Sequence, residues 1–284
     1  MSASRMRLVL STGLASTLMA TAPAFAQQIA PSIDVPAAEV ETVTQHAGPV
    51  YTFGLGAGFA PDYEGSDDYK AVPLWNLRAG NLYHPDTYVQ LFGPLLRSNF
   101  LPDEHWRLGI AGRFIPERDD VDNNKVDDLK SVDASVFLGA MAGYDFLAGR
   151  QQDLGIMLNG MQDVAGDNGF LGTIQGFYST ALNNRTRLGL NVETTWASED
   201  YMSNYFGIDA NDAARSGLDQ YNADEGFKDV AIGASLSHAF SESWSVSVLG
   251  RYARLLNDAK DSPIVDDEGD ANQFFAGVLA NFTF

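Results

Sequence analysis

The chain has 284 residues and a formal net charge of -19 at pH 7, and 45% of its residues are hydrophobic. After the amino-terminal segment no run of 18 apolar residues occurs, which excludes helical membrane spans. The acidic balance would repel the phosphates of nucleic acid, and the absence of cysteine excludes disulfides and thiolate metal sites.

The amino-terminal segment has the pattern of a secretory signal peptide. Arg5 and Arg7 precede an apolar stretch over residues 8–22, and Ala24-Phe25-Ala26 supplies the small residues of a cleavage site. An uncleaved anchor helix is the alternative, which the short apolar stretch disfavours. We therefore predict a cleaved signal peptide over residues 1–26.

The segment that follows, residues 27–48, is rich in Pro, Ala, Val and acidic residues and shows no period. This composition predicts a flexible periplasmic leader rather than a domain. Regular structure is expected over residues 49–284, because apolar residues begin to alternate with small or polar ones at Tyr51.

The alternation recurs in segments with the length and period of β-strands. Eleven segments are recognisable, although Pro73 weakens one of them, and Pro85 and Pro94 obscure the limits of strands between residues 82 and 100. Short turns at 147–151, 163–168 and 183–184 separate several of the segments. Because bacterial single-chain barrels have an even number of strands, we predict twelve, with ten as the alternative.

The last segment, NQFFAGVLANFTF over residues 272–284, has one apolar face and ends on an aromatic residue. A soluble β-sandwich also alternates, but it buries its apolar face and has no need of a terminal aromatic residue. Charged side chains such as Arg107, Glu193 and Arg251 recur on the less apolar face of other segments, which suits a polar lumen. We predict a transmembrane antiparallel β-barrel, with Phe282 and Phe284 resembling the assembly signal of such barrels.

Long polar connections at residues 116–130, 198–226 and 255–271 alternate with the short turns. Counted back from a periplasmic carboxy-terminus, the long connections fall outside the cell and the short turns inside. The longest connection could recognise an external partner, but a plug folded into the barrel mouth is favoured, with Arg215 paired to an acid such as Asp62 or Asp67.

Several loop stretches are too particular for generic turns, and they occur over residues 60–69, 200–207, 214–221, 226–230 and 254–265. In order and spacing they closely resemble the MltA-interacting protein (MipA)/OmpV family of Gram-negative outer-membrane proteins. The resemblance covers the chain from about residue 48, and Asn257 departs from it where Gly is expected. The candidate interaction residues in these stretches are Asp62, Tyr63, Glu64, Asp67, Asp200, Tyr201, Tyr205, Arg215, Asp229, Arg254 and Asp258.

The resemblance implies a place in the outer membrane, in contact with its lipids. It also implies a non-enzymatic scaffold that links a lytic murein transglycosylase to a murein synthase, without a cofactor. The alternative is a porin-like diffusion channel for small solutes. A narrow barrel of ten or twelve strands, which inward side chains largely fill, favours the scaffold.

Enzymatic activity and metal binding are both disfavoured. Ser235 and Ser237 share the inward face of their strand, whereas His238 points outward, so a Ser-His hydrolase site is not formed. The acidic loops contain no EF-hand pattern, which makes solvated loop charge the preferred explanation. We predict neither catalytic residues nor a metal site.

Overall fold

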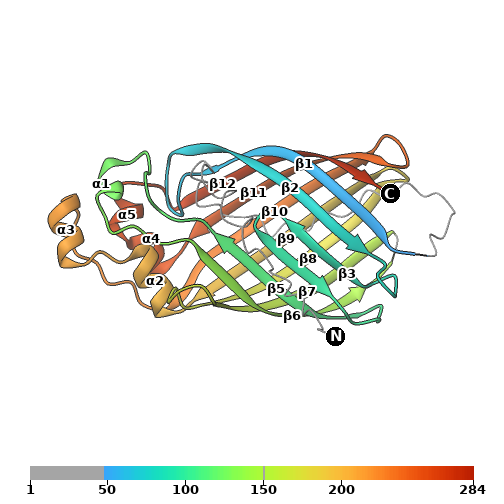
Figure 1. The fold of residues 1–284 in the computed structure, drawn as a ribbon, viewed down its shortest axis with the longest axis horizontal. Coiled ribbons are helices and arrows are strands. Elements are labelled where there is room, and N and C mark those ends of the chain that lie inside the picture. The colour runs from blue at the N-terminus through green and yellow to red at the C-terminus, as the bar shows by residue number, and fades with distance from the viewer. Residues whose placement is uncertain (1–47, 150) are drawn as a thin grey trace, which may run out of the picture.

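A computed structural model of the chain describes residues 48–149 and 151–284. The predicted signal peptide and nearly all of the predicted leader lie outside these residues. The described part is a single closed barrel with helices gathered at one end and the carboxy-terminus at the other (Figure 1).

Twelve antiparallel strands form the barrel, and each strand pairs with its neighbours in the sequence. The ring closes where β1 pairs with β12, from Thr52 opposite Thr283 to Phe59 opposite Ala276. The prediction of twelve strands is confirmed, and ten is wrong. The strands are β1 (Val50–Pro61), β2 (Tyr69–Gly80), β3 (Tyr88–Phe92), β4 (Leu95–Asn99), β5 (Trp106–Ile115), β6 (Ser135–Leu147), β7 (Gln152–Asp163), β8 (Phe170–Asn183), β9 (Thr186–Ala197), β10 (Gly226–Ala239), β11 (Trp244–Leu255) and β12 (Asn272–Thr283).

The outer surface of the barrel is apolar, which is the reverse of a soluble protein. Outward positions such as Leu55, Leu108 and Ile232 are exposed, and aromatic residues gather toward both ends of the wall. Tyr51, Trp106 and Phe284 belong to the aromatic group at the short-turn end, and Phe59 and Phe274 to the one at the helix end. An apolar band between two aromatic girdles is the exterior of a transmembrane β-barrel, so the predicted fold class is confirmed.

Five short helices and their loops form a cap over one end of the barrel (Figure 1). None of the helices in the described part of the chain is long and apolar enough to cross a membrane. The cap has its own apolar core, which includes Tyr63, Val126, Leu129, Leu218 and Ile264. The helices are α1 (Asn124–Asp127), α2 (Glu199–Phe206), α3 (Ala210–Ser216), α4 (Asn257–Asp261) and α5 (Pro263–Asp266).

The connections have the predicted asymmetry with one correction. The long loops 116–134, 198–225 and 256–271 all lie at the capped end, and the turns at 148–151, 184–185 and 240–243 lie at the other. The turn 164–169 was expected among the latter, yet it lies at the capped end, because it joins β7 to β8 in the same direction as the long loops. Its length alone was a misleading guide to its side.

The β3–β4 hairpin is much shorter than its neighbours and leaves part of β2 without a partner. β3 pairs with β2 only from Asn76 to Gly80, and Gly93 N–H donates to Trp75 O at 2.8 Å. The backbone N–H and C=O groups of successive strand residues point to opposite neighbouring strands. Pro73, two residues before Trp75, therefore directs its nitrogen toward the side of β3, at a height that the short hairpin does not reach. Proline has no N–H to leave unsatisfied there, which explains how a strand of this barrel tolerates it.

Candidate functional site

Helix α2 closes the capped end of the barrel. Its buried residues Tyr201, Met202, Tyr205 and Phe206 have the i, i+1, i+4, i+5 spacing of one helix face. They join one apolar cluster with inward-facing strand residues, among them Phe137, Met141 and Leu171. The rings of Tyr201 and Tyr205 stack with centroids 4.3 Å apart. The plug predicted for the longest connection is therefore present, and α2 is its central element.

Both ends of α2 are held by hydrogen bonds. At its carboxy-terminal end, Arg118 donates to Tyr205 O at 2.8 Å and the Ser262 hydroxyl donates to Phe206 O at 2.7 Å, which satisfies carbonyls that the helix leaves open. Before its amino-terminal end, Phe170 N–H donates to the Ser198 hydroxyl at 2.9 Å. Gly169 adopts a φ of +70° there, and a Cβ would lie 2.1 Å from Ser198 Oγ, so only glycine fits.

A buried ammonium group connects α2 to two other parts of the chain. Lys228 Nζ lies 2.6 Å from Asp229 Oδ2 and also forms an ion pair with Glu64, which lies in the β1–β2 loop. The Tyr201 hydroxyl donates to Glu64 Oε2 at 2.8 Å, and the Lys228 ammonium lies 5.7 Å from the centre of the Tyr201 ring. We call Glu64, Lys228 and Asp229 the ion triad.

A β-bulge makes the triad possible. Successive residues of a strand point to opposite faces, yet Lys228 and Asp229 are both buried. The register of β10 against β9 shifts between Phe227 and Asp229, which turns both side chains inward. The bulge therefore places opposite charges side by side in the lumen.

A second charged pair lies on β9 and β11, the two strands that flank β10. Arg251 donates from Nε and Nη2 to Glu193 Oε1 at 3.0 and 2.8 Å. Several buried atoms in this region have no hydrogen-bond partner in the protein: Arg113 Nε, both polar side-chain atoms of Asn191, Glu193 Oε2 and Asp229 Oδ1. Buried polar groups of this kind are normally satisfied, so they indicate a lumen that takes up water or polar solutes.

The plug tyrosines are un-ionised at physiological pH. Burial raises the pKa of Tyr201 well above its ordinary value, the nearby Glu64 carboxylate adds to the effect, and Arg113 opposes it. Burial likewise raises the pKa of Tyr205 to about 12. Because the Tyr201 phenol keeps its proton, it remains a hydrogen-bond donor to Glu64.

The structure brings together some of the predicted interaction residues and separates others. Glu64, Tyr201 and Asp229 meet at the triad, and Tyr205 lies beside them in the plug. The remaining ones lie elsewhere at the capped end. Asp62 pairs with Lys70 at 2.8 Å, Tyr63 is in the cap core, and Asp67 and Asp200 are exposed. Arg254 donates to Asn272 at 2.8 Å, and Asp258 accepts from Asp224 N–H at 2.8 Å.

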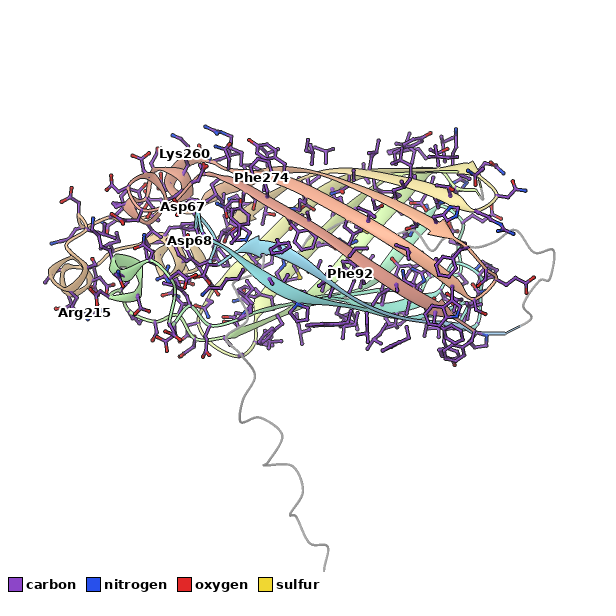
Figure 2. The ribbon with its side chains drawn as sticks, turned by 90° about the horizontal axis from the view of Figure 1, so that it is seen from above. Asp67, Asp68, Phe92, Arg215, Lys260 and Phe274 are labelled. Atoms are coloured by element: carbon purple, nitrogen blue, oxygen red, sulfur yellow. The ribbon has the colours of Figure 1, made fainter. Side chains whose placement is uncertain are left out.

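Arg215 does not pair with Asp62 or Asp67 as expected. It forms an ion pair with Asp212 one turn earlier in α3 and donates to Asp128 O at 3.0 Å, at the far tip of the cap (Figure 2). The residue missing from the predicted set is Lys228. Its signal in the sequence was the Lys228-Asp229 pair at the start of a strand, where two adjacent charges break the alternation.

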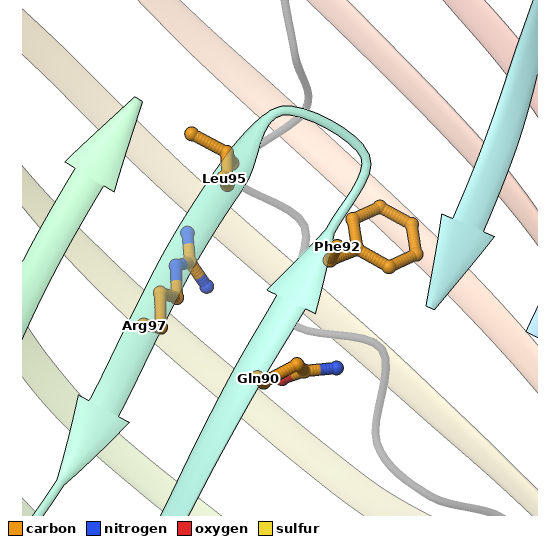
Figure 3. Close-up of a pocket in the computed structure, with 4 residues that line it drawn as sticks. All are labelled: Gln90, Phe92, Leu95 and Arg97. Carbon is orange, nitrogen blue, oxygen red and sulfur yellow. The ribbon is translucent and has the colours of Figure 1, made fainter. Parts of the chain in front are cut away.

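Other places that could hold a small molecule or support catalysis are poorly suited to it. The cavity lined by Gln90, Phe92, Leu95 and Arg97 measures about 10 Å³, room for one water molecule (Figure 3). Ser235 faces the lumen, whereas His238 is exposed and contacts Thr186 Oγ1 through Nδ1 at 2.9 Å. Within the described residues no three His, Asp or Glu side chains are grouped to hold a metal ion.

Comparison with solved structures finds other barrels. An outer membrane channel from Pseudomonas putida F1 is 11% identical, covers 89% of this chain and 100% of its own, and superposes with a TM-score of 0.47. The NanC porin is 7% identical, with coverages of 81% and 98% and a TM-score of 0.38. Likeness at this level says nothing about function.

Comparison with sequences identifies the family. The MltA-interacting proteins of Escherichia coli (strain K12) and Shigella flexneri are each 37% identical over 78 residues, which is 28% of this chain. The chain thus spans only 30% of the length of these curated relatives. A family model described as MltA-interacting protein MipA matches residues 53–284, almost the entire barrel. The chain belongs to the MltA-interacting protein MipA family.

Proposed function

We propose that this protein is a non-enzymatic scaffold of the outer membrane that links a lytic murein transglycosylase of the MltA type to a murein synthase. The observation that carries the proposal is the sealed barrel mouth. The buried side chains of α2, which are Tyr201, Met202, Tyr205 and Phe206, pack against inward-facing residues of the strands. A barrel that is closed at rest suits a membrane anchor for partners better than an open pore. The name of its relatives supports the partner.

The same proposal places the chain in the envelope. Residues 1–26 are removed on export, residues 27–48 form a periplasmic leader, and the apolar exterior of the barrel contacts outer-membrane lipids. The short-turn end faces the periplasm and the cap faces outward, following the usual asymmetry of such barrels. Murein lies in the periplasm, so the partner would bind the short-turn end.

Two turns at that end are joined by hydrogen bonds and form one surface that suits a partner. Asn99 Nδ2 donates to Asp86 O at 2.8 Å, and the Tyr83 hydroxyl donates to Phe100 O, so the turns 81–87 and 100–105 are bonded together. Tyr83 is 64% exposed in the first turn, and Glu104 is exposed in the second. The surface combines an aromatic ring with acidic groups.

Binding of a purified MltA-type transglycosylase to the refolded barrel tests the proposal. We expect saturable binding to the unmodified protein and a loss of at least about tenfold in affinity for Tyr83→Ala with Glu104→Lys, which is about 1.4 kcal/mol. The control, Val164→Ala with Glu225→Lys, truncates an exposed apolar side chain and reverses an exposed acidic one at the capped end, and it should bind normally. Absence of binding to the unmodified protein would refute the scaffold.

A further inference from the structure

The lumen beneath α2 holds polar groups that a permanently sealed core would not need. Asn191, Glu193 and Asp229 are buried, and each has a side-chain atom without a hydrogen-bond partner in the protein. Arg113 Nε is unpartnered as well. Unpaired buried polar groups destabilise a folded protein. If the barrel served only as an anchor, apolar residues in the same space would make it more stable.

These groups share one region of the lumen. Asn191 and Glu193 follow each other on the inward face of β9, and Asp229 lies opposite Thr195, the next inward residue of that strand. The positive charges of Arg251 and Arg113 lie near enough to attract the Asp229 carboxylate. The charged groups nearest to Asp229 balance, with Glu64, Glu193 and Asp229 against Arg113, Lys228 and Arg251. Such a lining suits small polar or zwitterionic solutes rather than ions of one sign.

What separates these groups from the outside is a loop helix held by non-covalent contacts. The ion triad is the polar part of that attachment, because Glu64 comes from the β1–β2 loop, Lys228 from the wall, and Tyr201 of α2 bonds to Glu64. Lys228 is almost completely buried. Loss of its charge would leave two buried carboxylates without their ammonium partner, which strongly disfavours the closed arrangement.

We propose that the barrel has a second activity, the passage of small polar and zwitterionic solutes, with α2 as the lid of the path and the ion triad as its latch. This activity is independent of the scaffold role, which concerns the opposite end of the barrel. The resting protein is closed in both cases, so the two proposals are tested by different variants.

Conductance of the refolded full chain in planar lipid bilayers tests the lid and its latch. Lys228→Met removes the ammonium, and a lid variant replaces residues 199–206 with a Gly-Ser segment of equal length. We expect rare openings of the unmodified protein, an open probability at least about 100-fold higher for Lys228→Met, and continuous conductance for the lid variant. In a salt gradient the reversal potential should lie near zero, because the charges directly beneath the lid balance.

Lys125→Met is the matched control. It also removes one ammonium from an ion pair, with Glu268 at 2.5 Å, but the Lys125 side chain is 52% exposed and belongs to neither the lid nor the ion triad. This variant should stay closed. Heat-dependent migration on gels reports folding of every variant, and should Lys228→Met fail to fold, Glu64→Gln with Lys228→Met removes one charge of each sign and serves instead.

Each result decides one part of the proposal. A folded lid variant that does not conduct would show that the lumen is no path at all. A folded Lys228→Met protein as closed as the unmodified one would refute the latch, and strong selectivity for cations or anions would refute the solute class. Labelling gives an independent readout, since the chain has no cysteine. Asn191→Cys should react with a water-soluble methanethiosulfonate much faster when Lys228→Met is also present.

Discussion

Arg251 donates two hydrogen bonds to a single carboxylate oxygen of Glu193, from Nε at 3.0 Å and from Nη2 at 2.8 Å. The two residues lie on β11 and β9, with β10 between them. The pair is buried, and the second oxygen of Glu193 has no protein partner. One charged contact on the inner side of the wall therefore connects β11 to β9 over the intervening β10.

Removal of Arg251 should be much more damaging than removal of an exposed charge. Arg251→Met leaves the Glu193 carboxylate buried and uncompensated, so we expect the free energy of unfolding to fall by about 3–5 kcal/mol. Lys125→Met breaks an exposed pair that solvent screens, so it should leave the free energy of unfolding nearly unchanged. Urea unfolding in lipid vesicles measures both. Equal effects would show that water reaches Glu193 freely.

Alkaline pH should weaken the attachment of α2. Burial raises the pKa of Tyr205 to about 12 from an ordinary value of 10.0, so the folded protein holds this proton more tightly than the unfolded chain. The contribution to stability is complete below pH 10 and is lost as the pH rises toward 12. Absorbance of tyrosinate at alkaline pH follows the titration. Tyr205→Phe should remove this component, and a titration near pH 10 for every tyrosine would contradict the burial.

Pro73 offers a test of the unpaired edge of β2. Replacing proline usually restores a hydrogen bond to a strand, but here the new N–H would face an edge without a neighbouring strand. We expect Pro73→Ala to destabilise the barrel by about 1–3 kcal/mol. Pro102→Ala, in an exposed turn where water can satisfy the N–H, should be close to neutral. Equal stabilities of the two variants would mean that the edge is hydrated.

The last residue should matter for assembly rather than for activity. Phe284 N–H donates to Tyr51 O and Tyr51 N–H donates to Phe284 O, both at 3.0 Å, and the two rings stack with centroids 5.8 Å apart. Deleting Phe284 removes this contact between the chain's first strand and its end. We expect less folded protein in the membrane, measured by heat-dependent migration on gels, whereas Phe240→Ala in a turn at the same end should assemble normally.

The barrel wall was predictable from the sequence because its signal is local. Alternation within one strand reports which side faces lipid, and the even strand count follows from closure. The exceptions were segments that break the period for a structural reason. Pro85 precedes the short strand β3 and Pro94 lies in the connection between β3 and β4, and the bulge at Lys228 turns two adjacent side chains inward.

The plug was predictable only as a possibility, because its contacts join distant segments. Glu64 and Lys228 are separated by 164 residues, and no local pattern specifies which loop carboxylate meets which buried amine. Arg215 instead has a local partner. It pairs with Asp212, one helical turn away, and this contact does not require two distant loops to be brought together, as pairing with Asp62 or Asp67 would.

The pairing of β1 with β12 also fixes an order of events. The hydroxyls of Thr52 and Thr283 lie 3.1 Å apart although 231 residues separate them in the chain. The edge of β1 that faces β12 has no partner until the last residues have been synthesised and exported. Contacts between residues so far apart in the sequence form slowly. Strands with one apolar face must wait unpaired in the meantime, in water, where they tend to aggregate. The ring therefore makes the protein dependent on whatever keeps it soluble between the two membranes.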